Sequence, residues 1–264
     1  MDRLSSPLLM LFAGLGTRCA DSVARPEWNL EFEARGVPGA FVLYEPALDR
    51  YSFCNESRAR QRFTPAGTFD LACAVAGLET GAIACEAEVF PWDGKPRFRV
   101  AHERDQTLAG AMRDGTDWMF QEVARRIGKP RMREWLDRLA YGNRGMAGSP
   151  DLFWLQGGLR VSAAEQVQFL HKLAESRLPA THRAQRMVRN AIVLEKTRDY
   201  TLYARCGSSG RTREPVDWWI GWIERKGRPL AYFALNLQPH ERMRVSECVA
   251  AGRAILQQAG VLPK

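Results

Sequence analysis

The chain has 264 residues, of which 45% are hydrophobic and 26% are charged. This composition is typical of a soluble globular protein and is sufficient to form a sizeable core. The formal net charge of +8 favours anionic partners, but the basic residues are scattered and interrupted by apolar ones. Because the sequence contains no zinc-ligand frame, RRM signature or basic helix, we interpret the charge as a solvated surface and expect no nucleic-acid partner.

The first 24 residues are typical of a secretory signal peptide. The apolar run at 4–16 is too short to cross a bilayer, and Ser22-Val23-Ala24 fits a small-x-small cleavage site. We therefore predict a bacterial protein exported to the periplasm, with a mature chain of residues 25–264. A cytosolic N-terminal helix is the alternative. No later segment is long and apolar enough to predict a stable membrane span.

The elements predicted from residue patterns run in a clear order along the chain. Helices are expected at 28–36, 65–81, 107–113, 117–127, 130–139, 162–174, 181–194 and 246–259. A hairpin is expected at 39–44 and 49–54, and aromatic-rich runs predict strands at 200–205, 218–224 and 230–237. Residues 82–104 and the glycine-rich 142–150 are expected to be loops. The helix at 162–174 has the strongest signal, because Ser162 and Glu165 form a capping box.

Strands therefore lie towards both ends of the chain and helices lie in the middle. This order predicts an α+β fold in which one antiparallel sheet, built from both chain ends and flanked by helices, carries an inserted helical region. No repeat or linker is evident, so residues 25–264 are expected to form a single domain.

The six cysteines do not indicate a metal site. They are Cys19, Cys54, Cys73, Cys85, Cys206 and Cys248. No C-x-x-C pair or metal-ligand spacing is present, so we predict neither a metal nor another cofactor. After export some of them could form disulfides, and the spacing does not determine which.

Several segments resemble class D (oxacillinase-type) β-lactamases in order and spacing. They are PAGTFDLACAVAGLETG (65–81), WDG (92–94), AMRDGTDWMFQEVARRIG (111–128), YGN (141–143), FWLQGGLRVSAAEQVQFL (153–170), LYARCG (202–207), WWIGWIE (218–224) and YFALNL (232–237). The resemblance implies a β-lactamase/transpeptidase-like fold. It also implies a mechanism in which a serine attacks the lactam carbonyl and an N-carboxylated lysine acts as general base.

The residues that carry this chemistry in the family are replaced in this chain. The serine and lysine of the family's S-x-x-K motif correspond to Gly67 and Asp70, and its S-x-V motif corresponds to Gly115-Thr116-Asp117. The K-T-G motif corresponds to Arg205-Cys206-Gly207, and the carboxylate-binding arginine to Cys248, for which Arg244 or Arg253 could substitute. The Y-G-N motif at Tyr141-Gly142-Asn143 and the tryptophan region at Phe153-Trp154-Leu155 are kept.

Asp70 and Asp117 are candidate functional acids, because the resemblance places both on one pocket floor. Two close carboxylates cannot both ionise cheaply, so one pKa should rise, which suits acid/base chemistry or binding of a hard cation. The alternative is that one acid pairs with Arg205 or faces water.

Three further positions have a functional and a structural interpretation. Cys206 is a candidate nucleophile whose pKa Arg205 would lower, or else a wall residue, since no histidine is placed to serve as its base. Tyr141 is a proton shuttle or an aromatic wall. Trp154 either packs or donates its N–H to Asp70.

We therefore predict a pocket with degenerate catalytic positions. These are Gly67, Asp70, Gly115, Asp117, Tyr141 and Trp154, with ligand contacts from Asn143, Leu155, Arg205, Cys206 and Gly207. The expected function is non-covalent binding of a β-lactam or peptidoglycan-like small molecule. The alternatives are a β-lactam hydrolase, or a repurposed hydrolase, that uses Asp70, Asp117 and water without an acyl-enzyme. The sequence predicts no particular oligomeric state.

Overall fold

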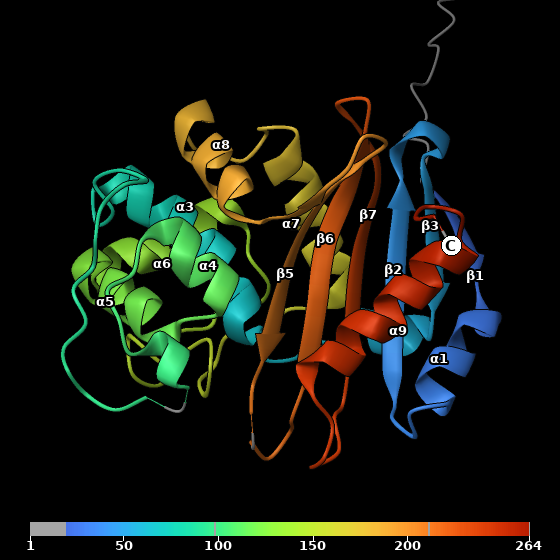
Figure 1. Cartoon of the computed structure of the whole chain (residues 1–264), viewed down its shortest axis with the longest axis horizontal. Coiled ribbons are helices and arrows are strands. Elements are labelled where there is room, and N and C mark those ends of the chain that lie inside the picture. Colours follow the sequence, from blue (N-terminus) through green and yellow to red (C-terminus); the bar gives the residue numbers. More distant parts are fainter. Residues whose placement is uncertain (1–19, 98, 211, 264) are drawn as a thin grey trace, which may run out of the picture.

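A seven-stranded sheet divides the molecule into two layers of helices (Figure 1). The computed structural model describes residues 20–97, 99–210 and 212–263. The strands follow the spatial order β1-β3-β2-β7-β6-β5-β4. Their bounds are β1 Asp21–Ala24, β2 Gly39–Glu45, β3 Arg50–Cys54, β4 Val193–Lys196, β5 Thr201–Ser208, β6 Asp217–Arg225 and β7 Arg228–Leu237.

The centre of the sheet joins the two ends of the chain. Strand β2 pairs antiparallel with β7, so that Phe41 lies opposite Leu235. All other pairings are antiparallel except that of β1 with β3. The α+β fold with a sheet built from both chain ends is therefore confirmed.

The helices have the following bounds. They are α1 Leu30–Glu33, α2 Glu56–Arg60, α3 Asp70–Thr80, α4 Leu108–Asp114, α5 Asp117–Ile127, α6 Lys129–Leu139, α7 Ala163–Ala174, α8 His182–Ala191 and α9 Val245–Gln258. Short 3₁₀ turns occupy Pro26–Asn29 (η1), Pro46–Leu48 (η2), Ala66–Phe69 (η3) and Val100–His102 (η4).

Two apolar clusters hold these layers together. The larger lies between the sheet and the inserted helices, where Trp218 and Trp222 of β6 meet α3 and α7 residues such as Val75 and Leu170. The smaller packs α9 and α1 onto the opposite face through residues that include Trp219 and Phe32. Alternate residues of β6 thus serve different cores, as the two-residue period of a strand requires. The helical lobe that carries α3 to α6 lies beyond the β5 side of the sheet (Figure 1).

Most predicted elements are present, but the helix expected at 65–81 is η3 followed by α3, and the short helix α2 was not predicted. The capping box of Ser162 and Glu165 does begin α7. The helix expected at 28–36 is instead η1 followed by the single turn of α1, and the helix expected at 181–194 ends at Ala191. Edge strands β1 and β4 were not predicted. They are short and largely exposed, so they lack the apolar alternation that marks a strand.

The predicted signal peptide falls mostly outside the described residues. The apolar run 4–16 and Cys19 belong to residues 1–19, whereas Asp21–Ala24 forms β1 and pairs with Arg50–Phe53 of β3. Cleavage after Ala24 would remove this strand from the sheet. In the described part of the chain, no helix is long and apolar enough to cross a membrane.

Candidate ligand-binding site

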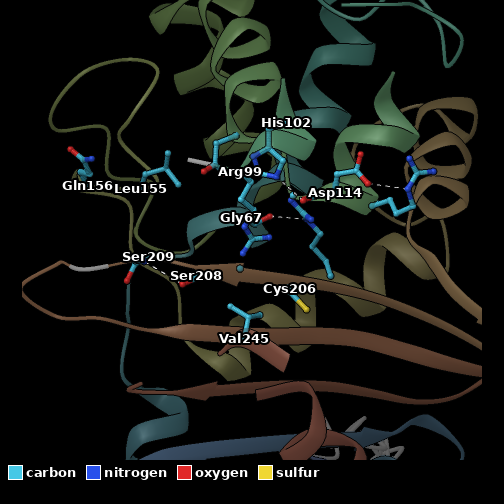
Figure 2. A pocket seen from close by; sticks show the side chains of 16 residues that line it. Gly67, Arg99, His102, Asp114, Leu155, Gln156, Cys206, Ser208, Ser209 and Val245 are labelled. Carbon is cyan, nitrogen blue, oxygen red and sulfur yellow. Dashed lines mark hydrogen bonds and ion pairs between the residues drawn. The ribbon is translucent and has the colours of Figure 1, made fainter. Parts of the chain in front are cut away.

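A pocket of about 540 Å³ opens between the end of β5 and the helical lobe (Figure 2). Its floor is formed by Gly67 in η3 and by Arg205 and Gly207 in β5. The η4 turn, the α4–α5 junction and the loop at Leu155 and Gln156 form the walls. The pocket therefore collects residues from segments that are far apart in the sequence.

Arg205 is the central side chain of the floor, and it is bound within the protein. Its Nε donates to the Gly67 carbonyl at 3.1 Å and its Nη1 donates to the Met112 carbonyl at 2.6 Å. Its Nη2 donates to Asp70 Oδ2. These bonds connect β5 to η3, to the first residue of α3 and to the last turn of α4. Arg205 is only 5% exposed, so its charge is committed to this contact before any ligand arrives.

Asp70 lies beneath the pocket and is fully buried. Burial raises the pKa of its carboxyl group from 3.8 to about 7. The Arg205 charge and hydrogen bond oppose this rise, and the nearby Asp117 charge adds to it. Its second oxygen, Oδ1, has no hydrogen-bond partner among the described residues. The expectation that one acid pairs with Arg205 is thus met by Asp70.

Gly67 and Gly115 replace two serines of the family, and both lie next to the Arg205 guanidinium. A Cβ atom at Gly67 would lie 3.3 Å from Arg205 Nη2 and 3.3 Å from the Cys206 carbonyl oxygen. A Cβ atom at Gly115 would lie 3.8 Å from Arg205 Nη1. Gly115 also ends α4 with φ of +74°, a left-handed conformation that favours glycine. The pocket floor therefore presents a guanidinium where the family presents hydroxyl groups.

Asp117 is the acid that ligands can reach. It begins α5, lines the pocket and is exposed, and no described residue donates a hydrogen bond to its carboxylate. The surrounding pocket walls raise its pKa by desolvation, while the charges of Arg205, His102 and Arg99 act in the opposite direction. The pair of acids predicted from the sequence is thus divided into a buried member and an accessible one.

Residues 99–104 supply wall residues that the sequence did not indicate. His102 Nε2 lies 3.0 Å from the Asp114 carbonyl oxygen, and His102 and Arg99 both line the pocket (Figure 2). His102 was assigned to a loop away from any site. It enters the wall because its carbonyl accepts from Trp118 Nε1 at 2.9 Å, which fixes η4 against α5. No local motif marks such a contact.

Cys206 does not match its predicted role as an activated thiol. Strand alternation turns its side chain towards α9, opposite to Arg205, where it packs in the cluster that contains Cys248. Figure 2 shows its sulfur on the far side of the strand from Gly67. Burial raises the pKa of the thiol to about 11, and the Arg205 charge opposes this only in part. The predicted lowering of this pKa is therefore wrong.

The aromatic residues form a rigid support behind the floor. Tyr141 donates to Gln166 Oε1 at 3.3 Å, and Gln166 Nε2 donates to Thr68 Oγ1 at 2.7 Å. Burial raises the pKa of Tyr141 above its ordinary range. Trp154 is fully buried, and its Nε1 has no acceptor among the described residues. The N–H bond from Trp154 to Asp70 that the sequence suggested is therefore absent.

Of the residues predicted to contact a ligand, all but Asn143 line the pocket. These are Leu155, Arg205, Cys206 and Gly207, although the Cys206 thiol points towards α9. A Cβ atom at Gly207 would lie 2.8 Å from the Thr68 nitrogen, so glycine is required for this close approach. Asn143 does not line the pocket, because its side chain donates to the Gly158 carbonyl and accepts from Gly145 and Arg160 nitrogens.

Neither of the two arginines that could substitute for the family arginine at position 248 reaches the pocket. Cys248 is fully buried in the α9 cluster. Arg253 pairs with Glu195 at 2.7 Å, and neither Arg253 nor Arg244 is among the residues that line the pocket. Among the described residues, no group of three or more histidine, cysteine, aspartate or glutamate side chains is arranged to hold a metal ion.

Comparisons with known proteins agree with this architecture. The family model described as penicillin binding protein transpeptidase domain matches residues 43–257. β-Lactamase OXA-5 of Pseudomonas aeruginosa is 36% identical, with 99% of each chain covered. β-Lactamase OXA-48 of Klebsiella pneumoniae is 35% identical, with 89% of each chain covered.

Solved structures show the same similarity. FUS-1 (OXA-85), a class D β-lactamase from Fusobacterium nucleatum subsp. polymorphum, superposes with a TM-score of 0.86 and 31% identity. The match covers 90% of this chain and 99% of that one. The class D β-lactamase YbXI from Nostoc gives a TM-score of 0.85 and 28% identity, over 90% of this chain and 100% of that one.

Proposed function

The chain belongs to the class D β-lactamase family, and we propose that it binds β-lactam or peptidoglycan-like ligands without serine-based hydrolysis. The observation that carries the proposal is the contact of Arg205 with Gly67 and Asp70. Position 67 has no nucleophile, and the carboxylate at position 70 is engaged by a cation. Removal of the nucleophile alone abolishes covalent catalysis.

The pocket supports binding even though its chemistry has changed. Its volume of about 540 Å³ is in the range of small-molecule sites. Leu155 contributes an apolar wall, and Ser208 and Ser209 contribute polar groups at the end of β5. The floor is held by the bonds of Arg205, so a ligand meets a preformed site.

Calorimetric titration with benzylpenicillin tests this proposal. We expect saturable binding, with a dissociation constant in about the micromolar to millimolar range, and no turnover of a chromogenic cephalosporin. A Ser208→Trp variant, which places a large side chain at an exposed position of the pocket wall, should lose the binding, and circular dichroism should verify that it folds. Absence of saturable heat from the wild type at millimolar ligand would reject the proposal.

A second candidate is hydrolysis by activated water without an acyl-enzyme. The observation that favours it is Asp117, an accessible carboxylate in the pocket with a raised pKa, as suits a general base near neutral pH. Asp70 is less suitable, because it is fully buried and bound by Arg205. Turnover that disappears in Asp117→Asn, with no mass adduct in the wild type, would establish this candidate.

We propose in addition that the chain is exported, as the apolar run 4–16 suggests. N-terminal sequencing of protein from a periplasmic extract would test this. A new N-terminus at or before residue 25 is expected, whereas a start at Met1 in the cytosolic fraction would reject it. A cut that keeps Asp21–Ala24 would retain strand β1.

A further inference from the structure

Some of the charged side chains that line the pocket form ion pairs within the protein, and others do not. Five of them line it: Arg99, Arg113, Asp114, Asp117 and Arg205. Arg205 is bound to Asp70, and Asp114 binds Arg113 at 3.0 Å and the nearby Arg104 at 2.5 Å. Arg205 is thus paired inside the protein, whereas Arg113 and Arg104 share the one carboxylate of Asp114, so this group keeps a net positive charge at the pocket edge, where Arg113 is largely exposed.

Arg99 and Asp117 remain, and neither forms an ion pair with any described residue. Both are exposed and both line the pocket. They are near enough for the Arg99 charge to oppose the rise in the Asp117 pKa, yet they do not contact each other. Among the described residues that line the pocket, Asp117 is therefore the carboxylate and Arg99 the guanidinium that have no ion-pair partner within the protein, and both are accessible to a ligand.

We propose that the pocket selects zwitterionic ligands, in which an ammonium group pairs with Asp117 and a carboxylate pairs with Arg99. This inference rests on the proposed binding function and names the ligand class for that site. Ion pairs formed with a ligand inside a concave wall are stronger than exposed pairs, because the wall excludes water from them.

The charge balance argues against ligands of a single charge. A purely anionic ligand would meet the Asp117 carboxylate and leave it without a counter-charge. A purely cationic ligand would meet Arg99, with Arg205 on the floor. Complementary potentials set specificity, because a like charge in the same position is repelled. A molecule that carries both charges neutralises both exposed side chains at once.

Ampicillin and benzylpenicillin form a matched pair of probes, since they share a carboxylate and differ by one amino group. At about pH 6.5, where an α-amino group is mostly protonated, we expect wild type to bind ampicillin roughly threefold to tenfold more tightly. Asp117→Asn should reduce the ratio of the two dissociation constants to about one. Arg99→Ala should weaken both ligands while it leaves the ratio unchanged.

The control is Asp137→Asn, which removes an exposed acid of α6 that lies outside the pocket, and it should keep the wild-type ratio. Equal binding of both penicillins by the wild type would overturn the inference while leaving the proposed function intact. A preference that persists in Asp117→Asn would also overturn it. If neither penicillin binds the wild type, the proposed function fails and the inference fails with it.

Discussion

The guanidinium of Arg205 lies against the carboxylate of Asp70, across the junction between β5 and α3. A second nitrogen of the same group donates to the Gly67 carbonyl at 3.1 Å. The two positions that define serine chemistry in the family are therefore joined by one buried cation. This contact explains both why the floor is ordered and why covalent chemistry is not expected.

At about pH 8, where Asp70 is ionised in the wild type, Arg205→Met should destabilise the fold strongly, because it leaves the Asp70 carboxylate buried without a counter-charge. Loss of one partner of a buried pair costs about 3–5 kcal/mol. The free energy of unfolding, measured by urea titration, should fall by this order. Asp70→Leu combined with Arg205→Met should recover much of the loss. Arg60→Met, which breaks an exposed pair with Glu56, should cost less than about 1 kcal/mol, and an equal cost for both single variants would contradict the account.

Stability should decrease as the pH rises from about 4 to about 7 and then level off, because the pKa of Asp70 is about 7 in the folded chain and 3.8 otherwise. A carboxyl group whose pKa is raised by folding contributes stability below its unfolded pKa, and that contribution is lost as the pH passes the folded pKa. Between about pH 4 and pH 7, wild type should lose stability relative to Asp70→Asn, by at most about 1.4 kcal/mol per pH unit. Parallel pH profiles for the two proteins would show that Asp70 does not titrate in this range.

Gly67→Ser alone should not restore acylation. The new Cβ would lie 3.3 Å from Arg205 Nη2, so the guanidinium can donate to the hydroxyl but cannot accept its proton. A serine needs a neighbouring base to become a nucleophile, and Asp70 remains held by Arg205. Intact-protein mass should therefore stay unchanged after incubation with penicillin. Gly67→Ser/Asp70→Lys restores both members of the motif and is the variant in which an adduct is expected; an adduct on Gly67→Ser alone would disprove the need for a base.

The Cys206 thiol should react slowly with iodoacetamide in the folded protein. Its pKa is raised to about 11 from 9.0, which lowers the thiolate fraction at pH 8 by roughly a hundredfold. Cys206 is partly exposed, so the raised thiol pKa rather than lack of access should slow it, and peptide mapping should find it alkylated mainly after unfolding. Rapid labelling of Cys206, or a penicilloyl group mapped to it, would contradict its place beneath α9.

The sequence predicted elements well where local patterns and burial agree. Helix α7 has a capping box and an apolar face, and β6 has a run of buried tryptophans. Strand β4 was not predicted because it is a short edge strand, with Leu194 53% exposed, and within the described part of the chain it pairs with β5 alone. Such a strand is defined by tertiary pairing rather than by its own residues.

The pocket residues named from the sequence belong to motifs, whereas those that the sequence did not indicate belong to a loop. Gly67, Asp117 and Arg205 line the pocket as the family resemblance implied. Arg99 and His102 were not predicted, because residues 82–104 show no periodicity and their course depends on contacts such as that of Trp118 with His102. The orientation of Cys206 follows from strand alternation beside Arg205, and this signal was available in the sequence.

Intact-protein mass spectrometry of the wild type, at a benzylpenicillin concentration that saturates calorimetric binding, tests the central claim most directly. The account predicts saturable binding together with an unchanged protein mass at every time point. A mass increase equal to that of the penicillin would show that a covalent acyl group forms, and it would contradict the conclusion that the contact of Arg205 with Gly67 and Asp70 leaves a binding site without a nucleophile.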